Sequence, residues 1–196
     1  MVLPRIALAS VLLVPLIAGC GRSRNVVIEA SGLTAPAAAA TRRCSSASGY
    51  TVHYPATWST VQDGAVPCRF FHPEPFVLPP STEAAGLAIN VQVAPAPFDD
   101  IVPRLGTGSA TAFEEILSRR NEHLSGHRAV RIESRTRQAG LRPTGVRRVT
   151  WYVDAGGGTL VATTAEGASA GAFPANVDVL DDIVAAVELR PGLPLT

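Results

Sequence analysis

Residues 145–166, GVRRVTWYVDAGGGTLVATTAE, decide the fold class because they describe a β-hairpin. Two runs rich in β-branched and aromatic residues, 145–155 and 158–166, are joined by the glycines at positions 156–158. β-Branched and aromatic residues favour strands, and glycines supply the positive φ angles that tight hairpin turns require. The segment therefore predicts two neighbouring antiparallel strands.

Further strands are predicted upstream, over residues 50–54, 66–72, 86–94 and 127–137. Apolar residues recur at every second position of 86–94, which is the pattern of a half-buried strand. The segment 127–137 alternates as well, with arginines and a glutamate on one face. If it pairs with the strand at 145–155, Arg135 lies near Arg147 and Arg131 lies near Trp151. The last three strands then form an antiparallel meander.

A first helix is predicted over residues 111–126, TAFEEILSRRNEHLSG. Thr111 and Glu114 have the spacing of a capping box, and apolar residues gather roughly on one helical face. Gly126 can end such a helix.

A second helix is predicted over residues 176–190, with Asn176 as its N-cap and Arg190 at its end. Its apolar stripe consists of Val177, Leu180, Ile183, Val184 and Val187. The resulting order, β-β-β-α-β-β-β-α, predicts an α+β fold in which helices pack on an antiparallel β-sheet.

The first residues predict export. Arg5 precedes an apolar run over residues 6–18, which is the pattern of a signal peptide covering residues 1–19. The end of that run, LIAGC at 16–20, resembles the bacterial lipobox, in which the cysteine accepts a lipid. We therefore expect Cys20 to carry acyl chains that hold the protein on the outer side of the cell membrane. An ordinary secretory signal with a chance cysteine is the open alternative.

Composition then divides the rest of the chain. Residues 20–48 are predicted to be the lipidated cysteine and a flexible tether, because they are rich in small residues and lack a sustained period. Residues 49–190 are predicted to be a single domain, and residues 191–196 a C-terminal tail. All 17 basic residues are arginines, yet the formal net charge is only +1, which gives no reason to expect nucleic-acid binding.

Cys44 and Cys68 remain once Cys20 is assigned to lipid. An even pair of cysteines in an oxidising compartment predicts a disulfide. Their spacing relative to His53 and His72 matches no zinc-binding pattern, and no Cys-x-x-Cys motif is present. Two free thiols and a metal site stay open as alternatives.

Two patterns bear on catalysis, and both are incomplete. Residues 167–171, GASAG, match G-x-S-x-G around Ser169, but no histidine follows the serine and Phe173-Pro174 interrupts the expected helix. His123 and His127 are four residues apart, but the glutamate of a metalloprotease motif is missing between them. We therefore predict no catalytic residue, no metal and no cofactor.

Arginines are concentrated in one part of the sequence. Nine lie between residues 119 and 148, where the acids are Glu122 and Glu133. One interpretation is a site for an anionic partner, either an envelope protein or an anionic lipid, formed by Arg131, Arg135, Arg147 and Arg148. The alternative is a solvated sheet edge protected by charge. If these four side chains are exposed, replacing them should change stability little.

Once the strands are placed, GYTVHYPATW at residues 49–58 resembles the opening strand of PsbP-like domains. The aromatic pair at 151–152, GTLVATT at 158–164 and VLDDIVAAVEL at 179–189 fit the same pattern. The sequence is thus similar to actinobacterial PsbP-like lipoproteins of the LpqN/LpqT type. The resemblance implies an α/β/α sandwich around an antiparallel sheet, with no shared catalytic residues. Trp58 is expected to pack in the core.

Three functions follow as expectations. The first is a lipid-anchored, non-catalytic binding or accessory protein of the cell envelope. The second is a carrier or sensor of a small amphiphilic ligand held between sheet and helix, and a serine hydrolase using Ser169 ranks last. A deep apolar cavity would favour the carrier, whereas a filled core would favour the accessory protein.

Overall fold

The computed structural model describes residues 40–62, 66–78, 86–104, 106–138, 143–167 and 172–190. The chain divides into two units, Met1–Ala37 and Ala38–Thr196, and every described residue belongs to the second. The predicted signal peptide, Cys20, Ser169 and the tail at 191–196 lie outside the described residues.

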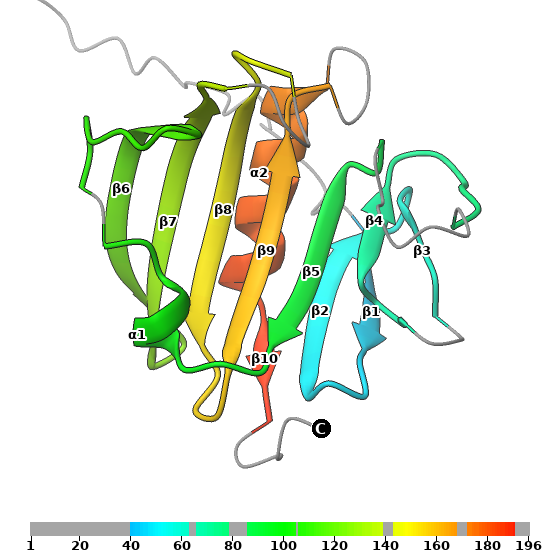
Figure 1. Ribbon diagram of the computed structural model, residues 1–196. Helices are drawn as coiled ribbons and strands as arrows, with labels where there is room; N and C mark the ends of the chain where they lie inside the picture. Colours follow the sequence, from blue (N-terminus) through cyan, green and yellow to red (C-terminus); the bar gives the residue numbers. More distant parts are fainter. Residues whose placement is uncertain are drawn as a thin grey trace, which may run out of the picture. The chain divides into compact units, whose positions relative to one another are not determined.

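Within the described residues, ten strands form two sheets (Figure 1). The large sheet has the order β3-β4-β5-β9-β8-β7-β6 and consists of β3 (Ser59–Thr60), β4 (Phe70–His72), β5 (Ile89–Ala94), β6 (Glu114–Leu124), β7 (His127–Thr136), β8 (Arg147–Asp154) and β9 (Thr159–Ala165). The small sheet has the order β1-β2-β10 and consists of β1 (Thr41–Ser45), β2 (Tyr50–Pro55) and β10 (Glu188–Leu189). Every strand pair is antiparallel, so the α+β class is confirmed.

The predicted meander is present in the expected register. Strands β8 and β9 form a hairpin that closes at Asp154 and Thr159. On the other side of β8, Arg131 lies opposite Trp151 and Arg135 lies opposite Arg147. The sequence patterns of residues 127–137 and 145–166 were therefore sufficient to predict how these strands pair.

The predicted helix at 111–126 is wrong, because residues 114–124 form strand β6 at the edge of the large sheet. The backbone N–H groups of Phe113 and Glu114 do donate to Thr111 Oγ1, but they do so in a turn that precedes the strand. Ser125 and Gly126 both have positive φ angles, 50° and 86°, and form the tight turn between β6 and β7. Pairing with β7 therefore overrides the local helical signal.

The C-terminal helix is confirmed with shifted ends. Helix α2 spans Phe173–Ala185, begins three residues before the predicted N-cap Asn176, and has proline in its first turn. It ends before the predicted Arg190, because residues 188–189 form β10 and pair with β2. Helix α2 packs against β9 and β2 (Figure 1).

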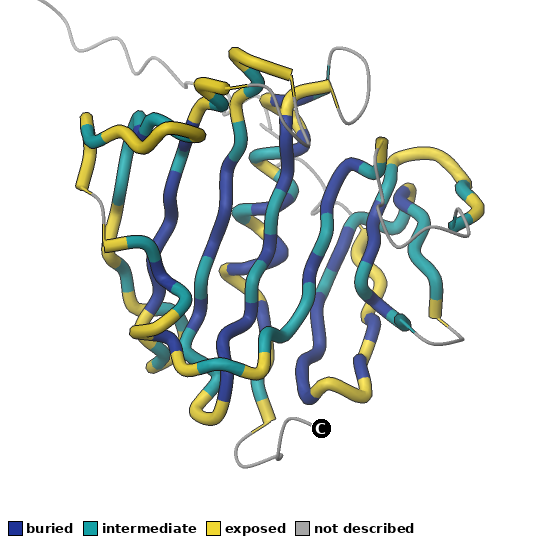
Figure 2. The backbone as a smooth tube through the Cα atoms, in the orientation of Figure 1, coloured by how far each residue is buried: buried dark blue, intermediate teal, exposed yellow. Residues whose placement is uncertain are grey.

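Two apolar clusters lie on opposite faces of the large sheet. The main core joins that sheet to α2 and β2, and its fully buried members include Tyr54, Phe71, Leu160, Leu180 and Ile183. The smaller cluster lies under the short helix α1 (Phe98–Ile101) and contains Ile116, Val130 and Ile132. Figure 2 shows the buried residues running along the central strands and α2. Trp58 is buried in the main core, as expected.

The predicted tether is too long. Residues 41–45, which lie inside the range 20–48, form β1 and pair with β2. Cys44 is buried in this strand. The composition of the segment could not reveal β1, because β2, with which β1 pairs, and Cys68, to which Cys44 is bonded, both lie elsewhere in the sequence.

Candidate binding site

A disulfide joins the two sheets. Cys44 of β1 and Cys68, two residues before β4, are bonded with an S–S distance of 2.03 Å, and both are buried. This confirms the predicted pair. Cys68 has a positive φ of 59°, and its N–H donates to the carbonyl of Val61 at 2.7 Å. Residues 66–69, which we had expected to be part of the strand, are therefore not included in β4, although the carbonyl of Arg69 still accepts from the N–H of Val91 in β5.

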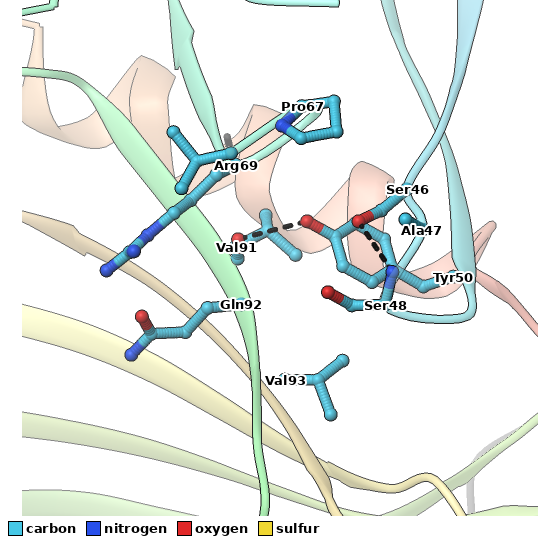
Figure 3. Close-up of a pocket in the computed structure, with 10 residues that line it drawn as sticks. Ser46, Ala47, Ser48, Tyr50, Pro67, Arg69, Val91, Gln92 and Val93 are labelled. Carbon is cyan, nitrogen blue, oxygen red and sulfur yellow. Dashed lines mark hydrogen bonds between the residues drawn. The ribbon is translucent and has the colours of Figure 1, made fainter. Parts of the chain in front are cut away.

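A pocket of about 180 Å³, here called the seam pocket, lies beside this disulfide (Figure 3). It is lined by residues 46–48 and Tyr50 beside the small sheet, by residues 66, 67 and 69 before β4, and by residues 91–93 of β5. The pocket is smaller than the roughly 300–1,000 Å³ that is usual for small-molecule sites. It therefore suits a single chemical group rather than a large ligand.

Tyr50 forms the buried wall of the seam pocket. Its hydroxyl lies 3.1 Å from both the carbonyl oxygen of Cys68 and that of Val91, and it donates to these oxygens. Burial raises the pKa of Tyr50 to about 12, so the hydroxyl stays protonated and remains a donor at physiological pH. Tyr50 thus holds β2 against both β5 and the segment before β4.

Arg69 supplies the charge of the seam pocket. Its Nε donates to Asn90 Oδ1 at 3.4 Å, and its guanidinium lies 5.0 Å from the centre of the Phe70 ring. Within the described ranges Arg69 forms no ion pair, and the ten lining residues include no acid. Figure 3 shows its guanidinium and the Gln92 amide on the same side of β5. The described lining of the pocket therefore carries one positive charge and no negative charge.

Arg131 differs from what the sequence analysis assumed. It is 8% exposed, and its guanidinium binds both carboxylate oxygens of Asp181 on α2, at 3.0 and 3.1 Å. The indole N–H of Trp151 donates to Asp181 Oδ1 at 2.6 Å. The face that carries Arg131 is thus covered by the helix, so Arg131 does not meet the condition of exposure under which we expected its replacement to change stability little.

The other three predicted arginines are more accessible. Arg147 pairs with Glu133, which raises the pKa of Arg147, and Arg148 pairs with Glu114. Arg135 is exposed, and the part of the chain that is described gives it no acidic partner. The sheet therefore brings Arg135 and Arg147 side by side, whereas Arg131 is committed to the helix.

The histidines make local contacts. His53 Nε2 lies 3.2 Å from Glu188 Oε1, and the ring Nδ1 of His127 donates to the carbonyl of Asp154 at 2.9 Å. Both His53 and His72 are half-buried strand residues. Among the described residues, no cluster of three histidine, cysteine, aspartate or glutamate side chains is arranged to hold a metal ion. Nor is any helix in this part of the chain long and apolar enough to cross a membrane.

Comparison with known proteins gives one kind of match. No family model matches the sequence, and no curated protein matches it. Among solved structures, the chain is similar to cyanobacterial PsbP (CyanoP) from a Synechocystis species, with a TM-score of 0.46 and 14% identity. The match covers 82% of this chain and 99% of the other. A likeness at this level does not transfer an activity or a site.

Proposed function

We propose that this chain is a lipid-anchored, non-catalytic binding or accessory protein of the cell envelope. The observation that carries the proposal is the filled core between the large sheet and its cover of α2 and β2. Large side chains from both sides, including Tyr50, Tyr54, Phe71, Leu180 and Ile183, are less than 3% exposed and occupy this space. Interactions with partners are then made at the surface.

The same core weighs against the carrier of an amphiphilic ligand. Such a carrier needs an apolar cavity, and ligand pockets are usually large and lined by apolar side chains. The seam pocket is small, and its lining includes Ser46, Ser48, Arg69 and Gln92. A polar notch of this kind suits recognition of one group on a partner.

Lipid anchoring is supported by the lipobox-like residues 16–20 and by the buried disulfide, which fits an oxidising compartment. It is tested by expressing wild type, Cys20→Ala and the matched control Ser23→Ala in a bacterium that processes lipoproteins. Wild type and Ser23→Ala should partition with membranes and carry acyl chains by mass spectrometry. Cys20→Ala should stay unprocessed or leave the membrane fraction. A Cys20→Ala protein with wild-type mass that remains in membranes would contradict the anchor.

The accessory role is tested by chemical crosslinking of the intact, membrane-held protein, followed by identification of bound proteins and lipids. One protein partner that is reproducibly crosslinked to wild type and is lost with the Cys20→Ala variant supports a role that depends on membrane placement. Stoichiometric recovery of a bound amphiphile with the purified protein would favour the carrier instead.

A site for an anionic partner on the predicted arginines is a separate part of the proposal. The ion pairs reduce the number of these arginines that are available to such a partner. Arg135 and Arg147 form the exposed pair of the proposed site. Arg148, the next residue in β8, pairs with Glu114, and Arg131 is held by Asp181 and is not available to a partner. Replacing Arg135 and Arg147 by glutamine should weaken binding to vesicles containing anionic lipid, and the loss should shrink as salt rises. The control is Arg42→Gln on the small sheet, which is exposed and remote from this pair in the sheet order. Equal binding of all variants at low salt would leave the arginines as a solvated surface.

A further inference from the structure

One edge of β5 is only partly paired. The N–H of Val91 donates to the carbonyl of Arg69 at 2.7 Å, and the carbonyl of Val91 accepts from Tyr50. Both backbone groups of Val91 therefore point toward β4. Because backbone groups alternate along a strand, those of Val93 point the same way. Strand β4 pairs with β5 through Phe70 and Phe71 alone, so the described residues offer Val93 no backbone partner on this side.

The gap beside Val93 exists because the chain is diverted. A straight continuation of β4 toward its N-terminus would place residues 67 and 68 opposite β5. Instead, the positive φ of Cys68 and its bond to Cys44 turn the chain toward the small sheet. The large sheet consequently lacks part of one strand, and the seam pocket occupies this position.

We propose that the seam pocket binds the C-terminal residue of an extended peptide from a partner protein. The peptide lies antiparallel to β5, in line with β4, and exchanges hydrogen bonds with the N–H and C=O of Val93. Its terminal carboxylate faces Arg69. Addition of a strand to a sheet edge and capture of a terminal carboxylate are both established modes of peptide recognition.

The direction of the peptide follows from the sheet. Every strand pair of this sheet is antiparallel, and a chain antiparallel to β5 runs in the same direction as β4. The C-terminal end of such a peptide points toward the start of β4. The peptide must end there, because Arg69 already occupies the next position opposite β5. The opposite direction would bring an N-terminal amine to the guanidinium of Arg69, which is unfavourable for two positive groups.

Charge and size both fit a terminal residue. Among the described residues that line the pocket, Arg69 is the one with a charged side chain, and the amide of Gln92 lies on the same side of β5 (Figure 3). A guanidinium can bind a carboxylate with two parallel hydrogen bonds. The space of about 180 Å³, together with the backbone groups of Val93 that no described residue pairs on this side, leaves room for the end of a chain and not for a long strand.

The test uses the full chain, labelled with ¹⁵N, and an equimolar pool of N-acetylated pentapeptides with randomised sequence and a free C-terminus. We expect saturable shifts of the Val93 amide and of the Arg69 Nε–H resonance. The same pool with amidated C-termini should bind at least about tenfold more weakly, because the charge pair with Arg69 is lost. Arg69→Gln should cause a loss of similar size and Arg69→Lys a smaller one, whereas Arg120→Gln, at an exposed position of β6 outside both proposed sites, should bind normally.

Three outcomes overturn the inference. They are the absence of a shift at Val93 with the free-acid pool, equal binding of the amidated pool, and unchanged binding by a folded Arg69→Gln protein. Equal binding of an amidated pool enriched in aspartate and glutamate would assign the site to an acidic side chain and would also refute a C-terminal ligand. The inference goes beyond the proposed function because it requires no lipid anchor, so either can fail without the other.

Discussion

Two arginines, Arg131 and Arg69, lie in contrasting surroundings. Arg131 is closed in by α2, and Asp181 binds its guanidinium through two oxygens while also accepting the indole N–H of Trp151. Arg69 is half-buried beside the seam pocket, and its one polar partner in the described residues is a neutral amide oxygen. The first arginine stabilises the interface between helix and sheet, whereas the second retains donors for a ligand. Burial of an arginine therefore says little about its role until its acidic partners are known.

Removal of the disulfide is expected to have the largest effect on stability, and this effect should be concentrated in the region around Arg69 and the seam pocket. Replacing Cys44 and Cys68 together by alanine opens a loop with a sequence separation of 24 residues. In the chain-entropy model this lowers the free energy of unfolding by about 3.5 kcal/mol. Urea denaturation of the variant and of reduced wild type should give similar losses. Amide exchange should increase near Tyr50 and Val91 before it increases at Trp151, and equal increases would remove the distinction between the two regions.

Asp181→Ala should have the next largest effect, because it leaves the guanidinium of Arg131 buried without its partner. Loss of one member of a buried ion pair costs about 3 kcal/mol, and here the indole N–H of Trp151 loses its acceptor as well. The matched control is Asp182→Ala, which removes an exposed carboxylate from the same helix. Chemical denaturation followed by tryptophan fluorescence measures both. Equal stability of the two variants would show that Arg131 is not held by Asp181.

Tyr50→Phe should have a moderate effect on the seam. The substitution keeps the ring but removes the hydroxyl that donates to Cys68 and Val91, at a cost of about 1 kcal/mol. The pKa of this hydroxyl is raised to about 12 in the folded protein, so stability is fully present below pH 10 and falls as the pH rises from 10 to 12. Alkaline denaturation should show this fall in wild type and less of it in Tyr50→Phe. Identical profiles would contradict the buried hydrogen bonds.

Arg69→Gln should change stability by no more than about 0.5 kcal/mol, because no carboxylate is left unpaired and the glutamine can still reach Asn90. The difference between the stability losses of Arg69→Gln and Asp181→Ala is the most direct test of the different roles of Arg69 and Arg131. A loss as large as that of Asp181→Ala would place Arg69 among the residues that hold the fold together.

Glu188→Gln should have the smallest effect. Hydrogen bonds from His53 and Arg43 lower the pKa of Glu188 below its ordinary value of 4.5 on the exposed face of the small sheet. A lowered carboxyl pKa stabilises the fold above pH 4.5, and this contribution disappears as the pH falls below that value. The variant should therefore lose less stability than wild type between pH 4.5 and pH 3 in thermal unfolding. An identical acid profile would show that the pair does not contribute.

The sequence was sufficient for the elements whose signal is local and repeated. The period of two in 127–137 and the β-branched and aromatic runs of 145–166, joined by glycines, predicted both hairpins and the pairing that puts Arg131 opposite Trp151. The apolar stripe from Val177 to Val184 gave α2. The prediction from the sequence failed at β6. Thr111 accepts the hydrogen bonds that are typical of a helix start, but the residues that follow form a strand. The tight Ser125–Gly126 turn was the better signal, and we had interpreted its glycine as a helix end.

The site was harder to predict, because its residues come together only through the fold. Alternation correctly placed Arg131 on the face opposite Val130 and Ile132, but it could not show that α2 would cover that face. Arg69 and Val93 belong to no motif, and their proximity depends on the left-handed conformation of Cys68. The available hint was Cys68, a predicted disulfide cysteine close to the start of a predicted strand. Its partner in β1 was hidden within a segment that had the composition of a linker.

Strand β1 also has a mechanical consequence. A pull on the chain that precedes residue 40 would load β1 first, at its pairing with β2. Without a covalent link, such a load could detach this edge strand from the small sheet. The Cys44–Cys68 bond redirects the force from the middle of β1 into the segment that precedes β4, and so into the seven-stranded sheet. The folded unit can thus bear tension at its N-terminal side without unravelling from that edge.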